Sequence, residues 1–390
     1  MKTHERIAIG ALLFMLILPN LSGCSRINED YQPSDTVTSA GSLSAVREPE
    51  DMRYIYSSLS PKEQEMYDIL QNAAENFLPR AEFPEKLSPE TLKKLYLAVY
   101  YQENIFWLTS SFYRPDSESS TLRLTYRYDE ETTHRMQADV SRKAWEISSA
   151  FDENTSDYEK LRTFHDYIVL NCTFSDDSQA DSTMYGVLCG GYSRCEGYAA
   201  SFNYLCRKSD IPCITVTGTG ADGGSHAWNK VMLEGEWYNV DCTWDDPILD
   251  PPDESFIRRY YFLVNDSDIE GITHFTDSTY FTYPECTSDN NYFRREGLYA
   301  GSADSAVSLL SSQASAALSE GLKDAEVRFT DEKAYYSAKA ALFDRKKIRQ
   351  VLEYADRSSD LSVMTVKYVR YCNDDLLIIH ITMICQADTR

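Results

Sequence analysis

A cysteine at the start of a predicted helix is the first residue in the sequence that could do chemistry. In Ser193-Arg194-Cys195-Glu196, a serine is followed three residues later by a glutamate, just before a helical pattern, which is typical of a capping box. This assignment places Cys195 at the second helical position. Unpaired N–H groups and the helix dipole stabilise negative charge there and favour a thiolate. The pattern therefore predicts a reactive thiolate at Cys195, against the alternative of a cysteine that only fills the core.

A thiolate nucleophile needs a basic partner, and that base needs a third group to orient it. His226 and Asp241 lie on two consecutive predicted strands separated by Glu234-Gly235-Glu236. If Glu234-Gly235 forms a two-residue turn, His226 and Asp241 are diagonal neighbours on one face of the sheet, about 7 Å apart. A three-residue loop without a bulge would place them on opposite faces. The sequence alone leaves both registers open.

Three ordered motifs around these residues resemble the bacterial transglutaminase-like superfamily. They are CEGYAASF from Cys195, SHAWNKV around His226 and WYNVDCTWDDP around Asp241. Flanking pieces, HDYIVLN before the cysteine and YYFLVNDSDIEGITHF after the aspartate, agree with them, so that the resemblance covers residues 158–275, about a third of the chain. The resemblance implies an α+β fold with a papain-like core, in which the helix bearing the cysteine packs on an antiparallel sheet bearing the histidine and the aspartate.

The resemblance also implies roles for individual residues. Cys195 would be the nucleophile, His226 the general base and acid, and Asp241 the carboxylate that orients the histidine, with no cofactor and no metal ion. The backbone N–H of Cys195 is the natural first donor to an oxyanion, and Tyr192 is a candidate for the second. His274 belongs to a matching segment but receives no role. The structural alternatives are core packing for the cysteine, a structural histidine, and a turn or cap residue for the aspartate.

The other groups of ligand-type residues lack the spacing of a metal site. The cysteines between 189 and 213, taken with His226, match no standard zinc module. Asp245-Asp246 and the acidic residues that follow lack the spacing of an EF-hand loop, and are interpreted as a solvated acidic loop. Cys189 would form a disulfide with Cys195 only if the two thiols approach closely.

The first residues have the pattern of an export signal. A 12-residue apolar run, residues 7–18, follows Lys2 and Arg6 and is shorter than the roughly 20 residues of a membrane span. It ends at LSGC, whose cysteine is Cys24, and this resembles the lipobox of bacterial lipoproteins. The resemblance implies removal of residues 1–23, a lipid on Cys24, and a location on the outer face of the bacterial cell membrane. An uncleaved anchor would leave the protein on the same face.

Composition excludes some classes of protein. The 390-residue chain has 38 Lys and Arg against 61 Asp and Glu, a formal net charge of −23, which argues against a basic nucleic-acid-binding face. Hydrophobic residues make up 43% and aromatic residues 13%, which favours packed domains over disorder. The ten cysteines include Cys24, so an odd number remains and at least one thiol stays free in any disulfide pattern.

The pattern of helices and strands predicts five segments. A capping box at Ser60, with Pro61 at the first helical position and Glu63 three residues after the serine, begins the folded part. A predicted hairpin, residues 363–371 and 376–384, turns at Asn373-Asp374 near the end. The segments are a lipoprotein signal peptide (1–23), a flexible tether (24–50), an N-terminal α+β module (51–150), a transglutaminase-like catalytic domain (151–290) and a C-terminal α+β module (300–390).

The leading hypothesis is a membrane-anchored extracytoplasmic enzyme that forms a thioester between Cys195 and the carbonyl of a peptide or carboxamide bond. It would act as a protease, an amidase or a transglutaminase on protein or peptide substrates at the cell surface. Hydrolysis is favoured over cross-linking, because the cell exterior is open to water and nothing in the sequence marks an amine-acceptor site. The alternative is a non-catalytic cell-surface module that binds proteins through the same fold. The sequence leaves the oligomeric state open.

Overall fold

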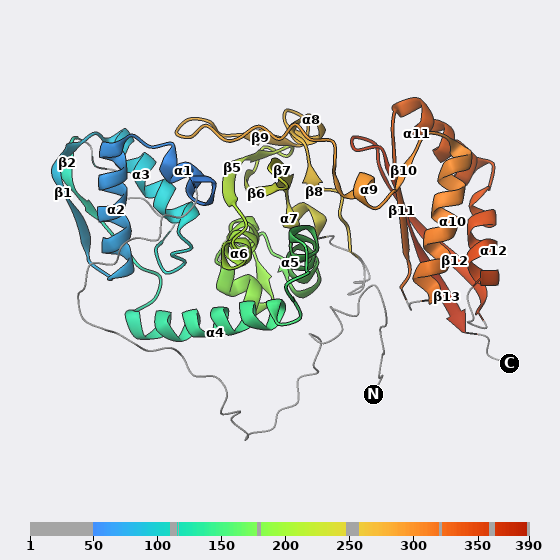
Figure 1. Cartoon of the computed structure of the whole chain (residues 1–390), viewed down its shortest axis with the longest axis horizontal. Coiled ribbons are helices and arrows are strands. Elements are labelled where there is room, and N and C mark those ends of the chain that lie inside the picture. The colour runs from blue at the N-terminus through green and yellow to red at the C-terminus, as the bar shows by residue number, and fades with distance from the viewer. Residues whose placement is uncertain are drawn as a thin grey trace, which may run out of the picture.

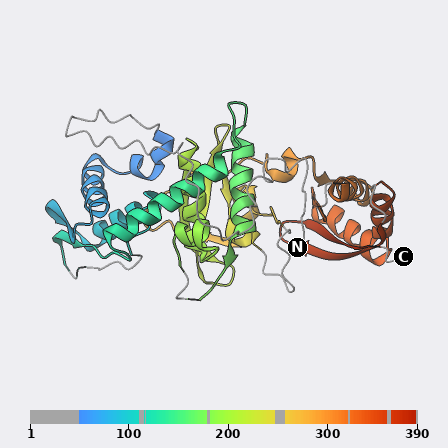
Figure 2. The same cartoon turned by 90° about the horizontal axis from the view of Figure 1, so that it is seen from below.

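The computed structural model describes residues 50–109, 115, 117–177, 181–246, 257–319, 322–358 and 363–387. These residues form three groups of elements that follow one another along the longest axis of the molecule (Figure 1), and the same order is seen from below (Figure 2). The predicted signal peptide, Cys24 and most of the predicted tether lie outside the described residues. Within the described ranges, no helix has both the length and the apolar character needed to cross a lipid bilayer.

The N-terminal group consists of helices around a two-stranded antiparallel sheet, β1-β2. Its elements are η1 (Glu50–Arg53), α1 (Tyr54–Ser57), α2 (Pro61–Glu75), β1 (Arg80–Leu87), α3 (Pro89–Gln102), β2 (Ser119–Arg123) and α4 (Glu130–Ser148). The long helix α4 extends from this group to the central one, where it contacts α5 and η2 (Figures 1 and 2).

The predicted start of α2 is confirmed. The Ser60 side chain accepts from the N–H of Glu63 at 3.3 Å, the Glu63 carboxylate accepts from the N–H of Ser60 at 2.9 Å, and Pro61 is the first helical residue. This reciprocal pair satisfies two of the N–H groups that every helix start leaves unpaired.

The central group is a five-stranded antiparallel sheet with helices α5 and α6 on one side, in the strand order β8-β7-β6-β5-β9. Its elements are α5 (Asp157–Asn171), β3 (Thr173–Phe174), η2 (Gly186–Gly190), β4 (Tyr192–Ser193), α6 (Cys195–Lys208), β5 (Cys213–Gly220), β6 (Ser225–Leu233), β7 (Glu236–Val240), α7 (Cys242–Asp245), β8 (Phe262–Val264), α8 (Asp266–Ile269), β9 (His274–Thr276) and α9 (Tyr292–Arg295). The predicted α+β class is confirmed, and α6 packs directly on β5 and β6.

The register of the β6–β7 hairpin follows from its turn. Glu234 and Gly235 both have positive φ, 56° and 83°, the conformation of a type I′ turn, which joins strands through two residues. Leu233 consequently pairs with Glu236 and Asn229 with Val240. This is the two-residue register, the one that places His226 and Asp241 on the same face.

The C-terminal group is a separate small sheet, in the order β10-β11-β13-β12, covered by α10 and α12. Its elements are β10 (Tyr299–Ala300), α10 (Ala303–Ser319), β11 (Asp324–Phe329), α11 (Glu332–Lys339), η3 (Ala340–Asp344), α12 (Ile348–Ser358), β12 (Val363–Asn373) and β13 (Ile378–Ala387). The last two strands form the predicted hairpin, and the Asn373 side chain accepts from the N–H of Leu376 at 2.8 Å in its turn.

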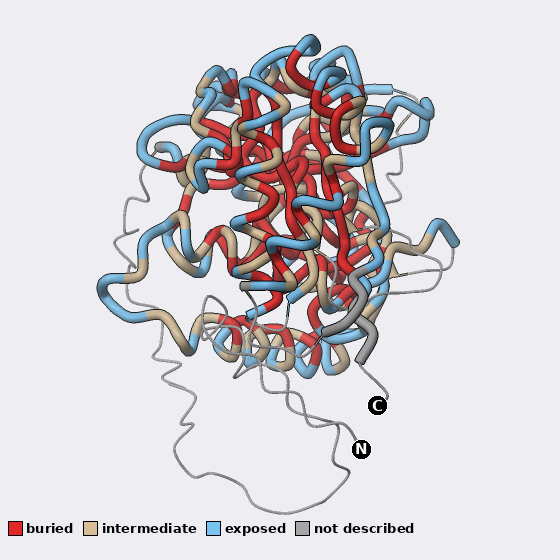
Figure 3. Tube along the Cα trace, turned by 90° about the vertical axis from the view of Figure 1, so that its right-hand side faces the viewer, coloured by how far each residue is buried: buried red, intermediate tan, exposed pale blue. Residues whose placement is uncertain are grey.

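Buried residues form two hydrophobic cores. One is continuous through the N-terminal and central groups and takes in Leu376 and Ile378 from the C-terminal hairpin, and the second lies within the C-terminal group. Figure 3 shows the buried residues gathered inside, with exposed residues on the outer loops. Between the central and C-terminal groups, Arg328 of β11 donates to both carboxylate oxygens of Asp268 on α8. The predicted domain boundaries stay predictions.

The positive φ of Gly235 predicts that a residue with a Cβ at this position lowers the free energy of unfolding. A Cβ at this position meets no neighbouring atom, so any destabilisation of Gly235→Ala comes from the left-handed backbone alone, about 1 kcal/mol. Urea denaturation of Gly235→Ala measures it. Gly301→Ala is the control, since Gly301 lacks a positive φ and its Cβ would touch only Thr330 at 3.9 Å. Equal stability of the two variants would contradict the assigned turn.

Candidate active site

Cys195 is the first residue of α6, not the second as the sequence predicted. The predicted capping box is wrong, because Arg194 is the N-cap residue and no side chain caps the helix. Ser193 instead belongs to β4, where its backbone pairs with Phe174 and its hydroxyl donates to the carbonyl of Asp181 at 2.5 Å. Cys195 nevertheless lies in the first helical turn, where unpaired N–H groups favour negative charge.

Gly197 allows this turn to pack closely. A Cβ on Gly197 would clash with the Ser193 hydroxyl and with the carbonyl of Thr183. The first turn of α6 is therefore held against the segment that precedes η2, and the half-buried Cys195 lies near enough to His226 to help raise the pKa of the imidazole.

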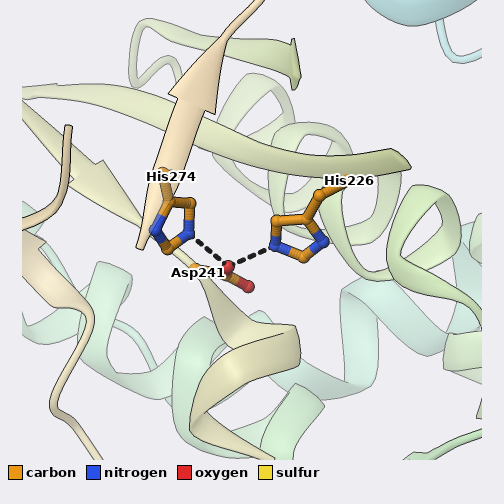
Figure 4. A group of neighbouring side chains, drawn as sticks. All are labelled: His226, Asp241 and His274. Atoms are coloured by element: carbon orange, nitrogen blue, oxygen red, sulfur yellow. Dashed lines mark hydrogen bonds and ion pairs between the residues drawn. The ribbon is translucent and has the colours of Figure 1, made fainter. Parts of the chain in front are cut away.

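The hairpin brings His226 and Asp241 into direct contact. His226 lies on β6, Asp241 follows β7, and the distance from His226 Nε2 to Asp241 Oδ2 is 2.6 Å (Figure 4). Because Nε2 is engaged by the carboxylate, Nδ1 is the ring nitrogen left to face the thiol of Cys195. The three residues singled out from the sequence thus form a chain of contacts, from thiol to imidazole to carboxylate.

Asp241 is buried and accepts four hydrogen bonds. Its Oδ1 accepts from the N–H groups of Thr243 and Trp244 at 2.9 and 3.0 Å, which makes Asp241 the N-cap of α7. Its Oδ2 accepts from His226 and, at 2.8 Å, from His274 Nε2. The cap alternative considered for Asp241 is therefore also correct, since one carboxylate oxygen caps a helix while the other holds the histidines.

The environment favours a charged pair. Burial acts to raise the pKa of Asp241, but the charge of His226 and the hydrogen bonds of both histidines outweigh it, so that the pKa lies well below its ordinary value. Burial acts to lower the pKa of His226, whereas the charge and hydrogen bond of Asp241 and the contact with Cys195 raise it to about 10. At neutral pH the site therefore holds an imidazolium against a carboxylate.

His274 is the residue that sequence reasoning left without a role. It begins β9, an edge strand that pairs Gly220 with His274, and its ring is fully buried. Its Nε2 binds Asp241, and its Nδ1 lies 2.9 Å from the hydroxyl of Thr273. No local signal could have placed it, because β9 joins the sheet through a long connection rather than a tight turn.

Aromatic rings enclose the charged group. The ring of Trp228 is stacked on His226 with 5.8 Å between centroids, and Trp244 lies 5.8 Å from His226 and 4.8 Å from His274. Trp228 is buried and its indole N–H donates to Asn239. These rings exclude water from the imidazole–carboxylate contact and so strengthen it.

Neither Tyr192 nor Cys189 forms a hydrogen bond or an ion pair with His226 or Asp241 in the part of the chain that the structure describes. The side chain of Tyr192 is 55% exposed, and its role as an oxyanion donor stays a prediction. Cys189 lies on η2 and is exposed as a residue. Its sulfur is partly buried, and this burial, with the charges of Asp139 and Glu146 on α4, raises the pKa of the thiol to about 11. Cys189 and Cys195 are both free thiols, and η2, which carries Cys189, packs against α4, so a disulfide between them finds no support.

The predicted solvated acidic loop is wrong for its first two residues. Asp245 is fully buried, where it accepts from the N–H groups of Tyr260 and Tyr261 and from His165. Asp246 accepts from the Tyr198 hydroxyl at 2.6 Å, and burial raises its pKa to about 6. The aspartates that follow at 250 and 253 lie outside the described residues.

His226, Asp241 and His274 also have the composition of a metal site, with three ligand atoms within 4.8 Å of one another. Ligands held at about 2.0–2.1 Å around a tetrahedral zinc ion would be about 3.3 Å apart. The N–O distances of 2.6 and 2.8 Å are shorter and correspond to charge-assisted hydrogen bonds. The geometry therefore fits proton-sharing groups better than metal ligands.

Comparison with known proteins agrees with this geometry. Residues 146–242, which include Cys195, His226 and Asp241, match the sequence model of the transglutaminase-like superfamily. The chain carries a transglutaminase-like core. The predicted resemblance and the predicted fold, a helix with the cysteine packed on an antiparallel sheet with the histidine and aspartate, are thereby confirmed.

Similar proteins match part of the chain. Kyphoscoliosis peptidase of Mus musculus is 28% identical over 138 residues, which cover 30% of this chain and 21% of that protein. The Homo sapiens protein of the same name is 34% identical over 87 residues, 19% of this chain and 13% of that protein. The chain thus spans about a fifth or less of the length of these relatives. The solved periplasmic domain of TgpA from Pseudomonas aeruginosa is 16% identical with a TM-score of 0.23, covering 34% of this chain and 58% of that one.

The raised pKa of His226 predicts a pH-dependent stability. Its folded value of about 10 exceeds the ordinary 6.5, so its contribution is fully present below pH 6.5 and is lost as the pH rises through 10. We expect the free energy of unfolding, measured with urea, to fall more steeply between pH 7 and 10 in the wild type than in His226→Gln. His134→Gln, at an exposed position of α4, serves as the control and keeps the wild-type slope. The same pH dependence of the unfolding free energy in the wild type, His226→Gln and His134→Gln would contradict the raised pKa of His226.

The contact of His274 with Asp241 predicts a graded loss of stability. His274→Leu removes a buried hydrogen bond to a charged group, which corresponds to about 1.5–3 kcal/mol. His274→Gln can still present an N–H at the same position, so we expect a smaller loss. Chemical denaturation at pH 7 measures both, and two variants as stable as the wild type would show that the bond contributes nothing.

Proposed function

We propose that the chain is a thiol hydrolase or acyltransferase, with Cys195 as nucleophile, His226 as general acid and base, and Asp241 as the orienting carboxylate. The observation that carries this proposal is the unbroken series of contacts from Cys195 through His226 to Asp241, with the pKa of His226 raised to about 10. A charged imidazole beside a thiol at a helix start stabilises the thiolate, which is the attacking form.

The geometry suggests the following sequence of steps. The thiolate of Cys195 attacks the carbonyl carbon of a peptide or carboxamide, and the N–H of Cys195 stabilises the oxyanion. His226 donates the proton from Nδ1 to the leaving amine, so that a thioester and a neutral imidazole remain. His226 then removes a proton from water or from a second amine, which attacks the thioester and releases an acid or a new amide. Asp241 keeps Nε2 protonated throughout and so fixes the tautomer.

The substrate and location belong to the proposal as well. We place the enzyme on the outer face of the bacterial cell membrane, held by a lipid on Cys24, with cell-surface proteins or peptides as substrates. The support is the signal-like start of the sequence, residues 1–24. Hydrolysis is the expected outcome where water is the only nucleophile that reaches the thioester. Transamidation is the expected outcome where an amine reaches the thioester first.

Alkylation kinetics test the nucleophile. We expect iodoacetamide to modify Cys195 at pH 6 much faster than it modifies an unfolded cysteine peptide, since His226 stays protonated there and favours the thiolate. Cys195→Ala should lose this fast phase, whereas Cys189→Ala, which removes an exposed thiol outside the chain of contacts, should keep it. A wild-type rate no faster than the peptide's would favour a non-catalytic binding module instead.

Product analysis separates the two reaction classes. Glutamine peptides incubated with the wild type and with Cys195→Ala are assayed for ammonia release and for incorporation of an added amine. Ammonia without incorporation identifies a hydrolase, and incorporation identifies a transferase. Cleavage of the peptide backbone, also lost in Cys195→Ala, identifies a protease.

A further inference from the structure

Three segments of the sequence that received no chemical role meet next to the short helix that Asp241 caps. They are HDYIVLN on α5, the end of WYNVDCTWDDP on α7 and the start of YYFLVN before β8. Helix α5 contacts α7 (Figure 1), and His165, Asp245 and Tyr261 bind one another there. All three are buried. These residues therefore belong to the core that carries Cys195, although none of them takes part in the proposed reaction steps.

His165 lies between two carboxylates. Its Nδ1 is 3.1 Å from Asp166 Oδ1, and its Nε2 is 3.1 Å from Asp245 Oδ2. An ionised carboxylate accepts hydrogen bonds but donates none, so both ring nitrogens must carry a proton for both contacts to form. Burial acts to lower the pKa of His165, but the hydrogen bonds and charges of Asp166 and Asp245 raise it above the ordinary value. His165 is therefore a buried imidazolium.

Arg259 supplies a second cation to this group. Its Nε and Nη2 donate to the two oxygens of Asp166 at 2.8 and 2.6 Å, which is a bidentate pair. Burial acts to raise the pKa of Asp166, whereas the charge of Arg259 and the contact with His165 hold it well below its ordinary value. We call His165, Asp166, Asp245 and Arg259 the buried charge cluster. Within it, two cations face two anions, so each charge is paired.

Asp245 connects the buried charge cluster to Asp241. It is the last residue of α7, a helix of one turn, and its backbone N–H donates to the carbonyl of Asp241 at 3.2 Å. Its carboxylate accepts from the N–H groups of Tyr260 and Tyr261 at 2.9 and 3.0 Å. The carbonyl of Tyr261 in turn accepts from the N–H of Asp241 at 3.1 Å. One backbone segment therefore contacts both aspartates, and the placement of each depends on the other.

The position of α7 decides how Asp241 meets His226. The N–H groups of Thr243 and Trp244 bind Asp241 Oδ1, which leaves Oδ2 for His226 Nε2 at 2.6 Å. The ring of Trp244 also lies 5.8 Å from that of His226. A shift of α7 would move these donors and the carboxylate that they hold. The contact between imidazolium and carboxylate is short and charge-assisted, so it weakens when either partner is displaced.

We propose that His165 is a positioning residue of the reaction, which holds α7 so that Asp241 presents Oδ2 to His226. The proposal rests on the proposed function, because it explains how the imidazolium–carboxylate pair of that function is kept aligned. The alternative is a buried charge cluster that only stabilises the fold. The two differ in one observable respect. Only a positioning role changes the protonation equilibrium of His226 when the cluster is altered in a chain that stays folded.

The pH profile of alkylation tests this role. His165→Gln removes the cation, and the single amide nitrogen cannot bind both carboxylates as the two ring nitrogens do, so α7 loses its fixed position. The contact of Asp241 with His226 then weakens, and the imidazolium no longer favours the thiolate as strongly. We expect the rate of reaction with iodoacetamide at pH 6 to fall about tenfold, and the midpoint of the pH profile to move to higher pH.

Two arginine variants form a matched pair. Arg259→Lys keeps a cation beside Asp166 but loses the two parallel hydrogen bonds. Arg328→Lys makes the same change where Arg328 donates to both oxygens of Asp268, between the central and C-terminal groups. Both should lower the free energy of unfolding in urea, but only Arg259→Lys should slow alkylation at pH 6. Arg259→Lys also carries the test if His165→Gln does not fold.

The outcomes separate this proposal from the proposed function. Folded His165→Gln and Arg259→Lys proteins with the wild-type alkylation profile would overturn the positioning role and leave the enzyme standing. Equal slowing in Arg328→Lys would also overturn it, since any loss of stability would then have the same effect. A wild type without fast alkylation would refute the proposed function instead. The nitrogen NMR signals of His226, titrated in the wild type and in Arg259→Lys, then decide the positioning role: a lower pKa in the variant supports it, and an equal pKa overturns it.

Discussion

The burial of one carboxylate, that of Asp241, is the constraint on which the architecture of the core depends. A charge removed from water is tolerated only when its oxygens are fully hydrogen-bonded. Asp241 meets this requirement with donors from three separate places, the first turn of α7, the imidazole of β6 and the imidazole of β9. The hairpin register, the short helix and the edge strand must all be correct at once, so the same carboxylate that orients His226 also ties together three segments of the fold.

Two further buried carboxylates of the core, those of Asp245 and Asp166, are also fully hydrogen-bonded. Asp245 accepts from two consecutive backbone N–H groups and from His165, and Asp166 pairs with Arg259 through two hydrogen bonds. These contacts hold the segment that leads into β8, the strand that extends the sheet beyond β7. The buried acids of this core thus act as anchors for non-local connections, each satisfied by partners that are distant in sequence.

Local signals in the sequence were sufficient wherever a few neighbouring residues decide the geometry. Glu234-Gly235 adopts a two-residue turn, the turn sets the register, and the register places His226 beside Asp241. Prediction failed where a residue distant in the sequence decides the geometry. Ser193 has the sequence pattern of a helix cap, but its hydroxyl donates to the carbonyl of Asp181 instead. Prediction also failed for His274, because β9 reaches the sheet through a long connection whose path no local pattern encodes.

A small cavity lies beside Cys195, between α3 and α6, so that its two walls come from different parts of the chain. The thiol, imidazole and carboxylate lie in the transglutaminase-like core, while Tyr100 and Tyr101 lie on α3, outside the residues that match the superfamily. Mutations in α3 can therefore reshape this cavity without touching Cys195, His226 or Asp241. The lining of this cavity and the group of His226 with Asp241 can therefore vary independently in sequence, although the two parts of the chain share one hydrophobic core and fold as one body.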